Sequence, residues 1–246
     1  MNKKIGIIFI VFLLLCSCVI TVGASDITED IYIKYQPDVT VLPSVESRIP
    51  NTIGIEPTFN LDGTGIGVRI DNFGVDGLDS VTITVNATGY TTPFTQSAYV
   101  PAFIGKTFEF EIPMKYSHTI YDITIYIVDG SGTQTVNRFL DVEYGEARLE
   151  ELCWHRGTFP TRAESLDHHF ENHGAEIAAP NIVHYLVRAG MCRDEVLKAI
   201  EEDTVYRDYN VSVSLQGTLG HKYKHKYTKY YIILADSNTH ILSFGR

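Results

Sequence analysis

The spacing of apolar residues along this chain changes at Gly145. Before it, apolar and polar residues alternate in short runs that are separated by Gly, Asp and Asn. After it, apolar residues recur every three or four positions, and alternation returns only beyond Asp203. The first pattern predicts an all-β sandwich, and the second predicts helices followed by an antiparallel sheet, which is a small α+β domain. The strands expected before Gly145 are 53–60, 65–71, 81–85, 107–112, 119–128 and 133–144.

Charge divides the chain at the same place. Residues 25–145 carry 6 basic and 16 acidic side chains, whereas residues 146–246 carry 12 and 14. Eight of the nine histidines lie in the second part. We therefore expect an extended lead-in over 25–51, a β-sandwich over 52–145 and a histidine-rich α+β domain over 146–246. The sandwich resembles the immunoglobulin-like accessory domains of secreted prokaryotic proteins, an architectural likeness that implies no activity.

The N-terminus has the layout of a secretory signal peptide. A basic start at Lys3 and Lys4 precedes an apolar run over 5–15, and Val22-Gly23-Ala24 supplies small residues before a cleavage site. We expect residues 1–24 to be removed and the rest to be secreted or held at the cell surface. Leu15-Cys16-Ser17-Cys18 is similar to a weak lipobox, which leaves a lipid anchor at Cys18 open. No later segment is long enough to predict a membrane span.

Three helices and three strands are expected in the second part. A capping box at 161–164 and Gly174 predict a helix over 162–173. A second helix is expected to open at Pro180 and end at Gly190, and a third to begin at Asp194. The strands expected after them lie at 211–215, 227–235 and 239–244.

Two cysteines stay after removal of the signal peptide. Cys153 and Cys192 both lie in the second part. In an oxidising compartment such a pair favours a disulfide, although two buried free thiols would also fit.

The densest group of candidate site residues is the run from His168 to His173. His169 and His173 are four positions apart, so a helix places them on one face, where two imidazoles can exchange protons or bind a metal. Histidines near a helix C-terminus are also favoured by the helix dipole alone. With His221 and His225 they would form a four-nitrogen set that suits zinc.

A second candidate is the lysine- and aromatic-rich ribbon over 221–231. In an extended chain, Lys222, Lys224 and Lys226 project to one side, and His221, Tyr223, His225 and Tyr227 to the other. Lysines interleaved with aromatic rings suit phosphate neutralisation and base stacking. An exposed edge strand protected by lysines is the other interpretation.

These motifs together resemble a known toxin family. The run 165–174, the helix over 184–189 and a closing hairpin over 230–244 resemble the C-terminal toxin domains of the barnase–EndoU–colicin–RelE-like nucleases. The resemblance covers about 80 residues, and each piece is short. Asn172 replaces a usual basic residue, Asn238-Thr239 stands at a common turn glycine, and Ser243 replaces threonine. The matching positions are His169, His173, Tyr185, Ala189 and the strand that ends at Ser243-Phe244.

The resemblance implies RNA cleavage without a metal or other cofactor. His169 and His173 would transfer protons, Lys226 or Lys224 would hold the phosphate, and Ser243 would position it. The partners would be RNA, an unknown target of the sandwich and, left open, an inhibitor protein. Two other functions stay open: a non-enzymatic surface-binding protein, and a domain that binds zinc through histidine. Substrate contacts are expected from Lys222, Lys224, His225 and Tyr227.

Overall fold

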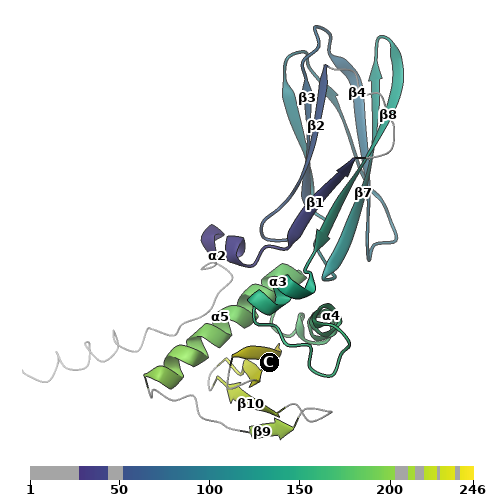
Figure 1. Cartoon of the computed structure of the whole chain (residues 1–246). Coiled ribbons are helices and arrows are strands. Elements are labelled where there is room, and N and C mark those ends of the chain that lie inside the picture. Colours follow the sequence, from purple (N-terminus) through teal and green to yellow (C-terminus); the bar gives the residue numbers. More distant parts are fainter. Residues whose placement is uncertain (1–27, 44–51, 203–209, 214–218, 226–227, 236–238) are drawn as a thin grey trace, which may run out of the picture.

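A computed structural model describes residues 28–43, 52–202, 210–213, 219–225, 228–235 and 239–246. The predicted signal peptide and Cys18 lie outside these residues, as do Lys226 and Tyr227. Figure 1 shows an elongated sandwich with helices and a smaller sheet at one end. None of the helices in the described part is both long and apolar enough to cross a membrane.

The first part is a sandwich of two antiparallel sheets. One sheet has the order β1-β8-β7-β4-β5 and the other the order β2-β3-β6. Their facing side chains are buried because alternate residues of each strand point inward, as the burial pattern of β7 shows. The strands are β1 (Asp38–Pro43), β2 (Ile53–Phe59), β3 (Ile66–Asn72), β4 (Leu78–Ala87), β5 (Phe94–Val100), β6 (Gly105–Phe110), β7 (His118–Asp129) and β8 (Gly132–Glu143).

The predicted extended lead-in is partly wrong. Residues Glu29–Lys34 form a helix, α2, and β1 is an edge strand that pairs with β8. Tyr32 and Tyr35 explain the helix, because one helical turn brings both onto the same side, where they are 9% and 3% exposed. Burial against the rest of the molecule therefore outweighs the β-propensity of the Ile-Tyr-Ile run. Strand β5 was not predicted, since its mostly exposed side chains show no apolar alternation.

The second part contains helices followed by strands. The helices are α3 (Glu146–Glu151), α4 (Arg162–His173) and α5 (Ile182–Glu201). Helix α4 has the predicted bounds, and the Thr161 side chain accepts a hydrogen bond from the Glu164 amide as the capping box requires. Four strands follow and pair antiparallel in the order β12-β11-β10-β9. They are β9 (Asn210–Val213), β10 (Leu219–Lys224), β11 (Tyr231–Ala235) and β12 (His240–Gly245).

Helix α5 corrects the prediction of two separate helices. It runs through Gly190 without a break. A β-carbon at Gly190 would overlap the Tyr35 hydroxyl, so this glycine allows α2 to approach α5 closely. Asp194 does not begin a new helix and instead forms an ion pair with Lys34 of α2. The sequence around Gly190 predicts a helix end because its packing partner, Tyr35, lies far away in the chain.

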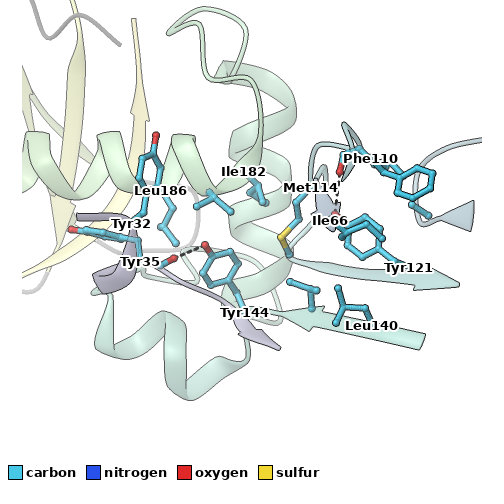
Figure 2. Close-up of a cluster of buried hydrophobic side chains, with 14 of the residues drawn as sticks. Tyr32, Tyr35, Ile66, Phe110, Met114, Tyr121, Leu140, Tyr144, Ile182 and Leu186 are labelled. Atoms are coloured by element: carbon cyan, nitrogen blue, oxygen red, sulfur yellow. Dashed lines mark hydrogen bonds between the residues drawn. The ribbon is translucent and has the colours of Figure 1, made fainter. Parts of the chain in front are cut away.

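The two parts share one apolar core (Figure 2). At their junction, the Tyr144 hydroxyl donates to the Tyr35 carbonyl at 2.6 Å, and the Ile182 amide donates to the Met114 carbonyl at 3.0 Å. Gly63 has a φ of 72° and packs against Val183. A side chain at position 63 would clash with Val183, so the absence of one leaves room for the start of α5. Loops at the base of the sandwich therefore support the start of α5.

Candidate functional site

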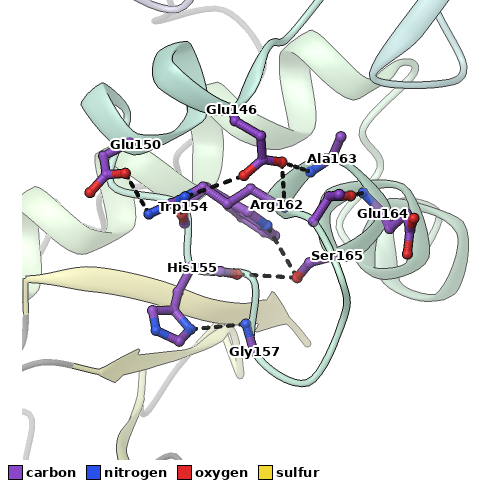
Figure 3. Close-up of polar contacts among 10 residues, drawn as sticks. Glu146, Glu150, Trp154, His155, Gly157, Arg162, Ala163, Glu164 and Ser165 are labelled. Atoms are coloured by element: carbon purple, nitrogen blue, oxygen red, sulfur yellow. Dashed lines mark hydrogen bonds and ion pairs between the residues drawn. The ribbon is translucent and has the colours of Figure 1, made fainter.

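Helix α4 is held in place by α3 and the loop that follows it (Figure 3). The Glu146 carboxylate accepts hydrogen bonds from the amides of Arg162 and Ala163, at the N-terminus of α4, where negative charge is favoured by the helix dipole. The Arg162 guanidinium forms ion pairs with Glu146 and Glu150 and donates to the Trp154 carbonyl. These contacts fix the direction in which α4 presents its histidines.

Trp154 links α4 to strand β12. Its side chain is fully buried, with ring centroids 6.0 Å from both His169 and Tyr185. Its backbone forms an isolated β-bridge with Ile241. The Tyr185 hydroxyl donates to the Phe244 carbonyl at 2.6 Å, which ties α5 to the same strand. Strand β12 is therefore positioned by both helices.

The histidines of α4 meet the β11–β12 hairpin. The rings of His169 and His173 are stacked, with centroids 6.0 Å apart and planes 18° apart. His169 Nδ1 lies 3.4 Å from Ser243 Oγ, and His173 Nε2 lies 3.4 Å from the Tyr231 hydroxyl. His173 Nδ1 lies 3.1 Å from Glu176 Oε2. We call His169, His173, Glu176, Tyr231 and Ser243 the histidine–hairpin cluster.

The two histidines have different surroundings. Burial, followed by the neighbouring charges of His173 and His168, lowers the pKa of His169 from 6.5 to about 4. His169 is therefore neutral at neutral pH, and it is a weaker base than an exposed imidazole. His173 faces the Glu176 carboxylate, and this hydrogen bond is the first cause that lowers the pKa of Glu176. An ionised Glu176 orients the His173 ring by accepting from Nδ1, which leaves Nε2 directed at Tyr231.

The lowered pKa of His169 makes stability depend on pH. An unfolded chain binds a proton at His169 near pH 6.5, whereas the folded chain does so only near pH 4. Stability from this residue is therefore complete above pH 6.5 and is lost as the pH falls toward 4, by about 3 kcal/mol. We expect His169→Phe to reduce this loss, as measured by denaturant unfolding at pH 7 and pH 4. Equal losses in both proteins would contradict the assignment.

The lysine side of the ribbon faces the same cluster. Lys222 Nζ lies 4.2 Å from the centre of the Tyr231 ring, and Lys224, which is exposed, lies directly opposite Tyr231 across the β10–β11 pair. Tyr223 points to the other side and is buried. Burial raises the pKa of Tyr231, which keeps its hydroxyl protonated and able to donate. Tyr231 therefore lies between Lys222 and His173 and contacts both.

Other predicted site residues lie elsewhere. His225 Nδ1 accepts from the Thr228 amide in the turn before β11, and His221 is exposed on β10. No group of three or more metal-binding side chains occurs among the described residues, so the four-histidine zinc site is not formed there. Lys226 and Tyr227 lie outside those residues, and their predicted roles stay predictions.

Two members of the cluster, Tyr231 and Glu176, are not among the residues that the sequence predicts. Tyr231 faces the site because it pairs with Gly245 at the end of β12, and that register is not visible in the sequence. Glu176 lies beyond the helix-ending Gly174, yet it is only three residues from His173. A search for carboxylates near each histidine would have found Glu176, but nothing local would have found Tyr231.

The predicted disulfide is wrong, because both cysteines are free thiols. Cys192 packs against the shared core, and burial raises the pKa of its thiol to about 12. Cys153 directs its sulfur toward the Glu151 carbonyl, 3.7 Å away. The two thiols are therefore fixed by separate local contacts.

Comparisons with known proteins give little. No protein-family model matches the chain, and no curated protein matches it significantly. Among solved structures, the fn3 domain of human collagen alpha-1(XX) chain is similar to part of it. That comparison has 13% identity and a TM-score of 0.27, and it covers 42% of this chain and 89% of the other.

Proposed function

We propose that the chain is an exported protein that cleaves RNA without a metal ion at the histidine–hairpin cluster. The observation that carries this proposal is the meeting of His169 and His173 with Ser243 and Tyr231, beside Lys222. These groups supply two proton-transfer residues, hydroxyl donors and a cation, which suit transfer at a phosphodiester. The resemblance to toxin nucleases supports the same activity and a small α+β fold for this part.

The geometry suggests separate roles for the two histidines. Neutral His169 would accept the proton of the ribose 2′-hydroxyl, and that oxygen would attack the adjacent phosphorus. His173, oriented by Glu176, would donate a proton to the 5′-oxygen as its bond to phosphorus breaks. The products would be a 2′,3′-cyclic phosphate and a free 5′-hydroxyl. Lys222, Ser243 and Tyr231 would stabilise the charge that develops on the phosphoryl oxygens.

This function is tested with purified protein spanning residues 25–246, which lacks the predicted signal peptide. We expect it to cleave tRNA and total RNA in EDTA and to leave 2′,3′-cyclic phosphate ends. Gel electrophoresis follows cleavage, and mass spectrometry identifies the ends. Folded protein that leaves both RNAs intact, in EDTA and with added zinc, would contradict the proposal.

A non-enzymatic role is favoured by a different observation. Several large apolar side chains are exposed at the end of the sandwich farthest from α4. This surface suggests that the sandwich attaches the protein to another component, whether or not the second part is an enzyme.

A further inference from the structure

An apolar surface occupies the distal end of the sandwich. The loop over 73–77 joins β3 to β4, and the loop over 101–104 joins β5 to β6. Figure 1 places this end away from α4 and α5. The apolar tip consists of Phe73, Val75, Tyr99, Phe103 and Ile104, which are 62%, 78%, 54%, 69% and 52% exposed.

One buried residue fastens both loops. Asn72 is 2% exposed, and its side-chain amide donates to the carbonyls of Asp76 and Pro101. Its side-chain oxygen accepts from the Gly74 amide, and its backbone amide donates to the Ile104 carbonyl. The exposed apolar side chains are therefore presented by an ordered scaffold.

Phe103 gives independent support for a functional tip. Its φ of 58° lies in the left-handed region, which is unfavourable for a bulky residue. The Phe103 side chain is nevertheless 69% exposed, so burial of the ring does not explain this conformation. Residues with a strained backbone conformation cluster at functional sites such as ligand-binding loops.

Area and charge indicate the kind of partner. Apolar side chains of this size, all more than half exposed, offer on the order of 500 Å², and binding to a lipid surface strengthens with the apolar area that enters it. Exposed Asp76 and Asp79 lie beside the tip, and Asp129 lies next to Asp79 because Ser80 pairs with Val128. Two exposed cations lie nearby: Lys106, and Arg69, which is paired with Asp71. This acidic border repels anionic lipids and suits headgroups that expose an ammonium group, which aromatic rings also attract.

We propose that the apolar tip docks onto a lipid surface of zwitterionic choline headgroups. Phe73, Val75, Phe103 and Ile104 would enter the acyl boundary, with Tyr99 at headgroup level. The acidic border would face the choline ammonium groups. The inference does not depend on RNA cleavage, since the tip and the histidine–hairpin cluster lie in different parts of the fold.

The test uses Phe103→Trp as a fluorescent reporter in the chain 25–246. Residues 1–24 are omitted because their apolar run would bind lipid itself. Trp154 is the chain's only native tryptophan and is fully buried, so it gives a constant background. We expect phosphatidylcholine vesicles to shift the emission of the reporter to the blue. Adding Phe73→Ser and Val75→Ser should weaken binding about tenfold or more. The matched control, Val41→Ser with Ile120→Ser, removes apolar side chains with 46% and 41% exposure away from the tip and should bind unchanged.

Other results would overturn the proposal. An absence of any blue shift with phosphatidylcholine would exclude this lipid surface. A blue shift that grows with protein concentration without vesicles, together with dimers in sedimentation velocity, would assign the tip to a second copy of the chain. Tighter binding to vesicles of equal parts phosphatidylcholine and phosphatidylglycerol would contradict the headgroup preference. Equal loss of binding in the tip and control variants would also count against the tip.

Discussion

Replacing His173 with alanine is expected to lower the rate of RNA cleavage by about 100- to 10,000-fold. The variant loses the imidazole that Glu176 orients and that faces Tyr231, so no group is left in position to protonate the leaving oxygen. Cleavage is measured in EDTA under single-turnover conditions, which report the chemical step. A residual rate within a factor of about ten of the unmodified protein would be too large for a lost proton donor and would remove His173 from the mechanism.

His118→Ala is the matched control. His118 lies on β7, is half exposed and pairs with Asp141 at 2.8 Å, so the substitution removes an imidazole from outside the histidine–hairpin cluster. We expect its cleavage rate to equal that of the unmodified protein. Near-ultraviolet circular dichroism of both variants shows whether each is folded. Equal loss of activity in both would point to a general defect, and unchanged activity in both to a contaminating nuclease.

Trp154→Ala is expected to lower the free energy of unfolding by about 3–5 kcal/mol. The substitution removes a large, fully buried ring that contacts His169 and Tyr185, and it leaves a cavity between α4, α5 and β12. Denaturant unfolding followed by far-ultraviolet circular dichroism measures the change. Because His169 would lose one wall of its environment, cleavage should also fall.

A suitable stability control is Tyr126→Ala. Tyr126 is an aromatic residue of β7 with 44% of its surface exposed, and its replacement should change the free energy of unfolding by about 0.5 kcal/mol or less. If Trp154→Ala costs as little as this control, then the contacts of Trp154 do not hold α4 against the hairpin.

Local signals predicted most of the secondary structure. The capping box at Thr161 gave the start of α4 because a cap depends only on the next three residues. The predictions of an extended lead-in and of a helix end at Gly190 were wrong because both depend on distant contacts. Tyr35 and Gly190 are explained only by each other, and 155 positions of chain separate them.

The site was predictable on the helix but only in part on the sheet, where Ser243 was expected and Tyr231 was not. His169 and His173 share a face because helical geometry fixes a spacing of four residues. The contact with Tyr231 depends on strand register and on how β12 lies against α4, which Trp154 and Tyr185 determine. The disulfide failed because the presence of two cysteines in one part does not fix the distance between them.

The junction shown in Figure 2 bears on how such a protein can be recombined. Tyr35 precedes the sandwich in the chain but packs on Gly190 of α5, and Met114 accepts a hydrogen bond from Ile182. If the histidine-bearing segment were fused to another domain, these neighbours would be lost and apolar side chains that they cover would be exposed to solvent. Chimaeras joined at Gly145 should therefore be poorly soluble unless they also contain α2 and the sandwich loops that carry Gly63 and Met114.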